Sequence, residues 1–234
     1  MDFFRDFVLT RFDDWTLSIH GVLDAVGLGT IMHKTIYQTV TQGFKSVFKL
    51  VYGLKVEGRT LVPLQEPAII CTKNSSGLYP FLAWIAVAEA TPRMLHQTFD
   101  RDFYAKPILR SLLQIMRGIP VMDGRIDTHC KERLKEKLLD KEIVGMTLEN
   151  EVQEGEEEQA RTIIKDFTIL DLANEMNVPI IPVNIPGIED ALDIKSEKFS
   201  VNKKVSIKIC EPFTPTGNHE RDHARLMEII TSED

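Results

Sequence analysis

The residues with the clearest chemical potential lie in one polar segment, Lys73-Asn74-Ser75-Ser76-Gly77-Leu78-Tyr79-Pro80. Residues 67–72 before it predict a buried strand, and Pro80 suits the first turn of an apolar helix over 81–88. A helix start offers unpaired backbone N–H groups, so a polar turn between strand and helix often holds reacting or anion-binding groups. In a purely structural interpretation, Asn74 and the two serines only satisfy the turn and cap the helix.

The surrounding sequence predicts the elements that position this turn. Apolar runs that alternate with amphipathic helical segments are typical of an α/β domain with a mixed, largely parallel sheet flanked by helices. The prolines of segment 178–183 predict a sheet edge or a bulge there. The expected strands are 54–57, 67–72, 93–97, 118–121, 143–147, 178–183 and 205–209, and the later helices are 106–116, 128–140, 161–176 and 219–230.

Length and composition limit the class of protein. A chain of 234 residues fits one sizeable domain, and we expect residues 53–234 to form it, after an N-terminal helical pair within residues 1–52. A net charge of −7 without a basic stripe makes nucleic acid an unfavourable partner. The cysteines Cys71, Cys130 and Cys210 are scattered and odd in number, which favours a reducing compartment over a disulfide framework or a zinc cluster.

The expected location is the cytoplasm, in a soluble or peripheral protein. The first residues are acidic where a signal peptide would be basic, and the longest apolar run is shorter than the roughly 20 residues of a spanning helix. The helix from Ile31 to Tyr52 is amphipathic, and four lysines but no acidic residue lie between positions 31 and 55. Such a helix can lie on an anionic membrane surface, or it can cover one face of the sheet with its lysines in water.

The polar turn resembles the signature Asn-His-x-Ser-x-x-Asp-Pro of the PlsC-like glycerolipid acyltransferase family. Ser76 and Pro80 match, and Leu78 suits an apolar position of the motif, whereas the histidine falls on Asn74 and the aspartate on Tyr79. Segments 118–121 and 178–183 resemble the second and fourth blocks of the family, and 143–145 with Glu149 resembles the approach to the third. The resemblance runs from about residue 56 to 212.

This resemblance implies an acyltransferase fold and a specific chemistry. In the family, a histidine oriented by the aspartate deprotonates the hydroxyl of a glycerol phosphate or lysophospholipid. The hydroxyl then attacks an acyl thioester on coenzyme A or acyl carrier protein, and no metal or redox cofactor is needed. Here Asn74 supplies an amide that does not accept a proton near neutral pH, and the neutral phenol of Tyr79 does not stabilise an imidazolium. The two catalytic positions are therefore both substituted.

The positions that resemble acceptor-binding blocks are altered as well. The usual arginine of the second block falls on Asp123, with Arg125 two residues further on, and in the third block only Glu149 remains, followed by Asn150. Six glutamates lie between positions 149 and 158, where relatives would hold a phosphate. Like charges about 4 Å apart repel by about 1 kcal/mol in water and more in a cleft, so a phosphate would be repelled.

Two hypotheses follow from this combination. In the first, the chain keeps the fold and a groove for lipid or an acyl chain, has lost the transferase chemistry, and acts at the cytoplasmic membrane face or with a protein partner. In the second, it is an active acyltransferase for an atypical acceptor, in which positioning of the bound thioester supplies the rate.

Two other groups of residues have the types of a catalytic site. His219-Glu220-Arg221-Asp222-His223 is a literal HExxH, the zinc-protease pattern, but its flanks are charged and few residues follow it. Ser75 or Ser76 with His96 has the residue types of a nucleophile and a base, but no Gly-x-Ser-x-Gly elbow surrounds either serine. An exposed terminal helix and a packed strand histidine are the simpler interpretations.

Overall fold

The centre of the molecule is a seven-stranded sheet with the order β1-β9-β6-β2-β5-β3-β4. The computed structural model describes residues 29–74, 79–100, 104, 110, 112–114, 116–121, 126–149, 167–186, 188, 192–193, 198–199 and 204–232. The strands of the main sheet are β1 (Lys55–Glu57), β2 (Ala68–Asn74), β3 (Leu95–Asp100), β4 (Ile119–Val121), β5 (Ile143–Glu149), β6 (Ile180–Asn184) and β9 (Ser206–Ile209). Two short strands, β7 (Leu192–Asp193) and β8 (Lys198–Phe199), form a separate antiparallel pair.

Five neighbouring strands, β6, β2, β5, β3 and β4, run parallel to one another. Strand β9 pairs antiparallel with β6, and β1 pairs parallel with β9, so the last two strands run opposite to the other five. The prediction of a mixed, largely parallel sheet is therefore confirmed. Parallel strands end at a common edge, so the carboxyl ends of the five strands define one rim of the sheet.

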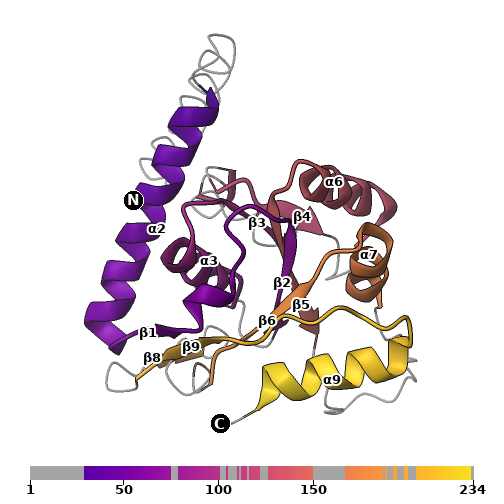
Figure 1. Cartoon of the computed structure of the whole chain (residues 1–234). Helices are drawn as coiled ribbons and strands as arrows, with labels where there is room; N and C mark the ends of the chain where they lie inside the picture. The colour runs from indigo at the N-terminus through magenta and orange to yellow at the C-terminus, as the bar shows by residue number, and fades with distance from the viewer. Residues whose placement is uncertain are drawn as a thin grey trace, which may run out of the picture.

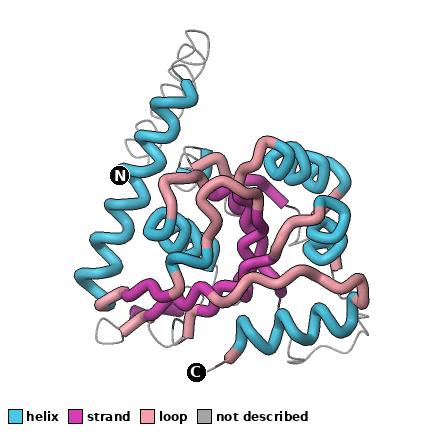
Figure 2. Tube along the Cα trace, viewed as in Figure 1, coloured by secondary structure: helices cyan, strands magenta, loops and turns pink. Residues whose placement is uncertain are grey.

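Helices cover both faces of this sheet (Figures 1 and 2). On one side, the α3 face, lie α2 (Gly29–Tyr52) and α3 (Tyr79–Ala90). On the other, the α6 face, lie α6 (Thr128–Leu139), α7 (Thr168–Met176) and α9 (His219–Thr231). Strand alternation divides the core accordingly: Ala68 and Ile70 of β2 pack on the α3 face, and Ile69 and Cys71 on the α6 face. A single 3-10 turn, η1 (Arg59–Leu61), joins β1 to β2.

Helix α2 is the long element on the outer side of the α3 face (Figure 1). Its buried side includes Tyr37, Phe48 and Tyr52, which belong to the same apolar cluster as α3. Val47 and Leu50 on another side are 57% and 88% exposed. No helix among the described residues has the length and apolar character to cross a membrane.

Of the two alternatives drawn from the prolines of segment 178–183, the sheet edge is wrong, because β6 is an interior strand between β9 and β2. The pairing on its β9 side is irregular, however: Ile180 bridges Phe213 and Val183 pairs with Ile209, so one extra residue lies opposite β6, as in a bulge. Strand β9 pairs with β6 only through Val183 and Asn184. Pro182 comes just before these pairs, and its carbonyl accepts a hydrogen bond from the backbone N–H of Cys210, beyond the end of β9. Pro182, which has no N–H to donate, therefore lies in the irregular part of this pairing, between the Ile180–Phe213 bridge and the Val183–Ile209 pair.

Most predicted elements agree with the observed ones within a few residues. Strands β2 and β5 each run two residues beyond their predicted ends, to Asn74 and Glu149. Helix α7 begins at Thr168, and residues 150–166 before it lie outside the described part. Most of the predicted helix 106–116 and the first N-terminal helix also lie outside the described residues.

Candidate functional site

The two central parallel strands end side by side at the carboxyl rim. Asn74 is the last residue of β2, Glu149 is the last residue of β5, and the two are register partners. The pairing of β2 with β5 therefore brings together two residues at positions of the family motif, although they are 75 positions apart along the chain. This rim is where α/β folds with parallel strands usually hold their ligands.

Tyr79 is held at the same rim by helix α3. It is the first residue of α3, with Pro80 in the first turn as predicted, and it is only 4% exposed. The helix is apolar except for Glu89 near its end, and it packs into the core. The indole Nε1 of Trp84 donates a 2.9 Å hydrogen bond to the carbonyl of Leu95 in β3. Tyr79 is therefore a fixed, buried residue at the position that the resemblance assigns to an aspartate.

The remaining predicted site residues are placed only in part. Asp123, Arg125 and Asn150 lie outside the described residues, as do Ser75 and Ser76. Strand β4 ends at Val121 on the same rim, since it runs parallel to β3.

His96 is not placed to act as a base beside Asn74, because it lies toward the opposite end of the sheet. It is the second residue of β3, paired with Val144, five residues before Glu149 on β5. At about 3.3 Å per residue, the His96 level is roughly 17 Å from the rim. His96 is 3% exposed, and burial, helped by the nearby positive charges of Lys137 and Arg117, lowers its pKa to about 4. This histidine is a neutral core residue, and the pairing of His96 with Ser75 or Ser76 loses its support.

The HExxH segment forms the first turns of α9, but its side chains have other partners. Asp222 is buried and accepts hydrogen bonds from the backbone N–H groups of Thr216 and Gly217, at 2.7 and 3.1 Å, and from the Thr216 hydroxyl. His219 Nε2 lies 3.0 Å from Asp171 Oδ1 of α7. Within the described ranges no group of three histidine, cysteine or acidic side chains is placed to hold a metal. The segment is explained as a capped helix docked on α7.

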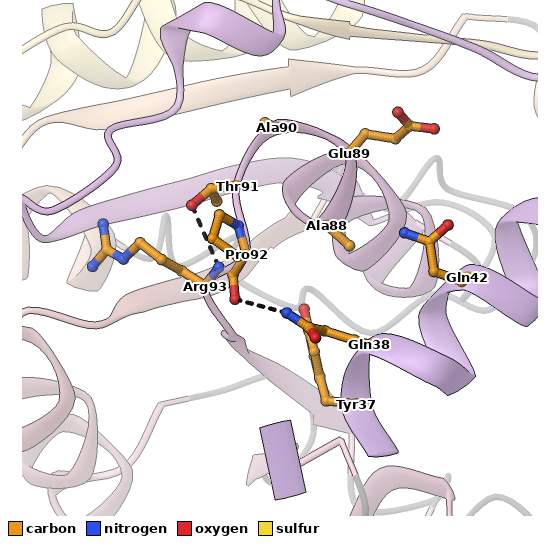
Figure 3. Close-up of a pocket in the computed structure, with 9 residues that line it drawn as sticks. All are labelled: Tyr37, Gln38, Gln42, Ala88, Glu89, Ala90, Thr91, Pro92 and Arg93. Carbon is orange, nitrogen blue, oxygen red and sulfur yellow. Dashed lines mark hydrogen bonds between the residues drawn. The ribbon is translucent and has the colours of Figure 1, made fainter. Parts of the chain in front are cut away.

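One pocket of about 390 Å³ lies between α2 and the end of α3 (Figure 3). It is remote from the candidate site, because α3 starts at the rim and its twelve residues span roughly 18 Å. Its polar groups are engaged in holding the elements together: Gln38 Nε2 donates to the carbonyl of Pro92, and Glu89 pairs with Lys45 and Arg59. Arg93 donates to the carbonyls of Pro63, Glu66 and Lys141. We interpret the pocket as part of the packing between α2 and the end of α3, not as a functional site.

Two further buried polar residues of the central strands were not predicted. Thr72 of β2 and Gln97 of β3 are 1% and 0% exposed, on strands that flank β5. Thr72 has the strand parity of Ile70, and Gln97 that of Leu95 and Phe99, so both belong to the α3 face. The sequence contained one signal for them, a polar residue at an inward position of an apolar strand, but the face and the neighbours became known only from the structure.

Comparison with known proteins identifies the fold. Neither a family model nor a curated protein matches the sequence. The structure is similar to the crystal structure of the 1-acyl-sn-glycerophosphate (LPA) acyltransferase PlsC from Thermotoga maritima, with a TM-score of 0.65 and 19% sequence identity. The alignment covers 98% of this chain and 95% of that one. The chain has the fold of a PlsC acyltransferase over nearly its whole length, as the motif resemblance implied.

Proposed function

We propose that this chain is an acyltransferase-family protein that binds lipid or acyl groups and whose transferase chemistry is impaired. One observation carries the proposal. The rim of a PlsC-like fold presents Asn74 beside Glu149 at the ends of β2 and β5, and α3 opens with the buried Tyr79. If the motif is aligned as its resemblance suggests, its two catalytic positions hold an amide and a phenol, which supports the proposal.

Loss of the base is the main chemical consequence of these substitutions. An asparagine amide donates and accepts hydrogen bonds but takes no proton near neutral pH. General acid–base catalysis contributes roughly 10²–10⁴-fold to rate, so the transfer step is expected to be slower by at least that factor. Binding of an apolar chain does not depend on the base and is expected to survive.

A membrane surface is the proposed place of action, on the cytoplasmic side. Helix α2 exposes Phe44, Val47 and Leu50, and no acidic residue lies between Gly29 and Tyr52. An apolar helix side on a positively charged element is suited to an anionic lipid surface. A protein partner on the same helix side is the competing proposal, and vesicle binding distinguishes the two.

A second candidate is an active acyltransferase for an acceptor without phosphate. The position of Glu149 favours it, because this carboxylate-bearing residue is the register partner of Asn74. A carboxylate is able to act as a base where the surroundings raise its pKa. Positioning of the thioester and the acceptor would supply the rest of the rate.

Binding and turnover measured on the same preparation test both candidates. We expect the full-length protein to carry lipid that mass spectrometry identifies, and to transfer no acyl group from acyl-coenzyme A to a panel of lysophosphatidic acid, glycerol 3-phosphate and monoacylglycerol. Transfer to a neutral acceptor alone would favour the second candidate. A protein that neither binds acyl groups nor transfers them would contradict both.

A further inference from the structure

Helix α6 carries basic residues on both sides of the stripe that it buries against the sheet. The buried stripe consists of Cys130, Leu134 and Leu138. On the side toward α7, Glu175 of that helix lies 3.3 Å from Lys131 and 2.6 Å from Lys135. The two lysines on this side are therefore paired with a carboxylate of a neighbouring helix.

The basic residues on the opposite side of α6, Arg133 and Lys137, have no comparable partner. They are four positions apart, so their side chains are neighbours on the helix surface. Arg133 forms no ion pair within the described residues, and the partner of Lys137 is the exposed Asp140 at the end of the same helix, at 3.7 Å. The sheet ends at β4 on this side.

Arg117 adds a third basic residue, two positions before β4. Its φ of 52° lies in the left-handed region, which the end of a helix normally gives to glycine. The N–H groups of Arg117 and Gly118 donate to the carbonyls of Gln114 and Leu113, at 3.0 and 2.8 Å, and hold the backbone in this conformation. An arginine adopts it only at a cost in free energy, so its side chain has a fixed starting point.

The surroundings of His96 show that the three positive charges act on one place. The register of β3 with β4 puts Arg117 level with His96 on the neighbouring strand. Burial is the main cause that lowers the pKa of His96, and the positive charges of Lys137, Arg117 and Arg133 lower it further. Positive charge is thus concentrated here, in a protein whose net charge is −7.

We propose that Arg117, Arg133 and Lys137, the basic cluster, form a binding site for a phosphate group at the β4 edge of the α6 face. Guanidinium groups present paired N–H donors that match phosphate oxygens, and a lysine adds a compact positive charge. A bound dianion would offset charges that otherwise repel one another. The site lies toward the end of the sheet opposite the carboxyl rim, so the inference goes beyond the proposed function and does not depend on it.

A phosphate titration of the full-length protein at pH 7 and constant ionic strength tests this inference. The imidazole resonances of His96, identified by their loss in His96→Gln, serve as a local NMR reporter. Inorganic phosphate should shift them with half-saturation at about 1 mM, as expected for several charge-assisted contacts. Sodium chloride at equal ionic strength should give no saturable shift, because it only screens the charges.

Two double variants of α6 distinguish a local site from net charge. Arg133→Gln/Lys137→Gln should weaken phosphate binding by about tenfold or more, and Arg117→Gln should weaken it in the same direction. Lys131→Gln/Lys135→Gln is the matched control, because it removes the same charge from the other side of the same helix and should leave half-saturation unchanged. Circular dichroism of each variant confirms that it is folded.

Equal weakening in the two double variants would show that only net charge matters, and the inference would be wrong. A wild-type shift no larger than that with chloride would also overturn it. Glycerol 3-phosphate and a short-chain phosphatidic acid, titrated in the same way, identify the source of the phosphate: similar affinities support a site for the phosphate group alone, and tighter binding of the lipid supports a lipid head group. A failure of acyl binding, measured separately, would contradict the proposed function and leave the basic cluster unaffected.

Discussion

The buried polar side chains on the two faces of the sheet differ in their hydrogen bonding. On the α6 face they have partners: Asp222 accepts hydrogen bonds from Thr216 and Gly217, and Asn184 donates to the backbone carbonyl and hydroxyl of Ser232 at 2.6 and 3.0 Å. On the α3 face, the Tyr37 hydroxyl accepts from the Leu95 N–H and the Trp84 indole donates to the Leu95 carbonyl, whereas Thr72 Oγ1 and Gln97 Oε1 have no partner among the described residues. On the α6 face these hydrogen bonds fix helix α9 to its own preceding loop and to the sheet, whereas on the α3 face they fix α2 and α3 to β3 and leave two strand groups without a partner among the described residues.

The elements that form the fold and the residues of the predicted motif lie in different parts of the molecule. The strands and helices that form the fold keep a PlsC-like arrangement over 98% of the chain. Asn74 and Tyr79, which the motif resemblance predicts to stand at the catalytic positions, are at the rim of the sheet. Substitutions at a rim leave the packing intact, so a scaffold of this kind can lose a reaction and keep its fold.

The largest predicted effect is on the scaffold face. Leu134 of α6 is fully buried on the α6 face, and Leu134→Ala should lower the free energy of unfolding by about 2–5 kcal/mol, because it leaves a cavity. Leu139, at the end of the same helix, is 71% exposed, so Leu139→Ala should change stability by less than about 0.5 kcal/mol. Chemical denaturation measures both. Equal effects of the two substitutions would show that α6 is not packed as described.

A second prediction concerns acid stability and the buried His96. Its pKa of about 4 in the folded protein lies below the ordinary value of 6.5, so the unfolded chain binds the proton more tightly. The stability associated with neutral His96 is complete above pH 6.5 and is lost as the pH falls toward 4, by about 3 kcal/mol in total.

Denaturation midpoints between pH 7 and pH 4 measure this loss. His96→Gln should flatten that part of the profile, because glutamine does not titrate, whereas exposed His129→Gln should leave the profile as in the wild type. An unchanged slope in His96→Gln would mean that His96 is not held neutral by burial.

The smallest effect on stability is expected on the outer side of α2. Val47 and Leu50 are largely exposed, so Val47→Gln/Leu50→Gln should change the unfolding free energy by less than about 0.5 kcal/mol. Flotation with anionic vesicles should nevertheless show clearly weaker binding, since the apolar contact with lipid is removed. If the double variant keeps full vesicle binding, α2 does not carry the membrane contact.

The sequence predicted the architecture well because its signals are local. Apolar runs such as β2 and the 3.6-residue pattern of α2 depend on neighbouring residues alone, and both elements lie where they were expected. The prolines of segment 178–183 left an edge and a bulge open, and only the tertiary pairing of β6 shows that the strand is interior and that Pro182 lies at an irregularity of the pairing. The buried position of Gln97 was missed as well, because it depends on the space left by Gly145, 48 residues away along the chain.

The candidate site was predicted in part. Asn74 and Tyr79 were expected in the turn between a strand and a helix, and the structure places them at its two borders, as the last residue of β2 and the first of α3. That Glu149 is the register partner of Asn74 was not predicted. The loss of catalysis remains a prediction, because it depends on chemistry that packing does not determine.

The most direct test of the central claim is the rate of acyl transfer by the wild-type protein that has been shown to bind an acyl ligand. We predict a rate at the level of the protein-free control with every acceptor, and a measurable rise in Asn74→His/Tyr79→Asp, which restores a base and its orienting carboxylate. A wild-type rate well above the control that falls in Asn74→His/Tyr79→Asp would contradict the account, because the native residues would then be performing the reaction.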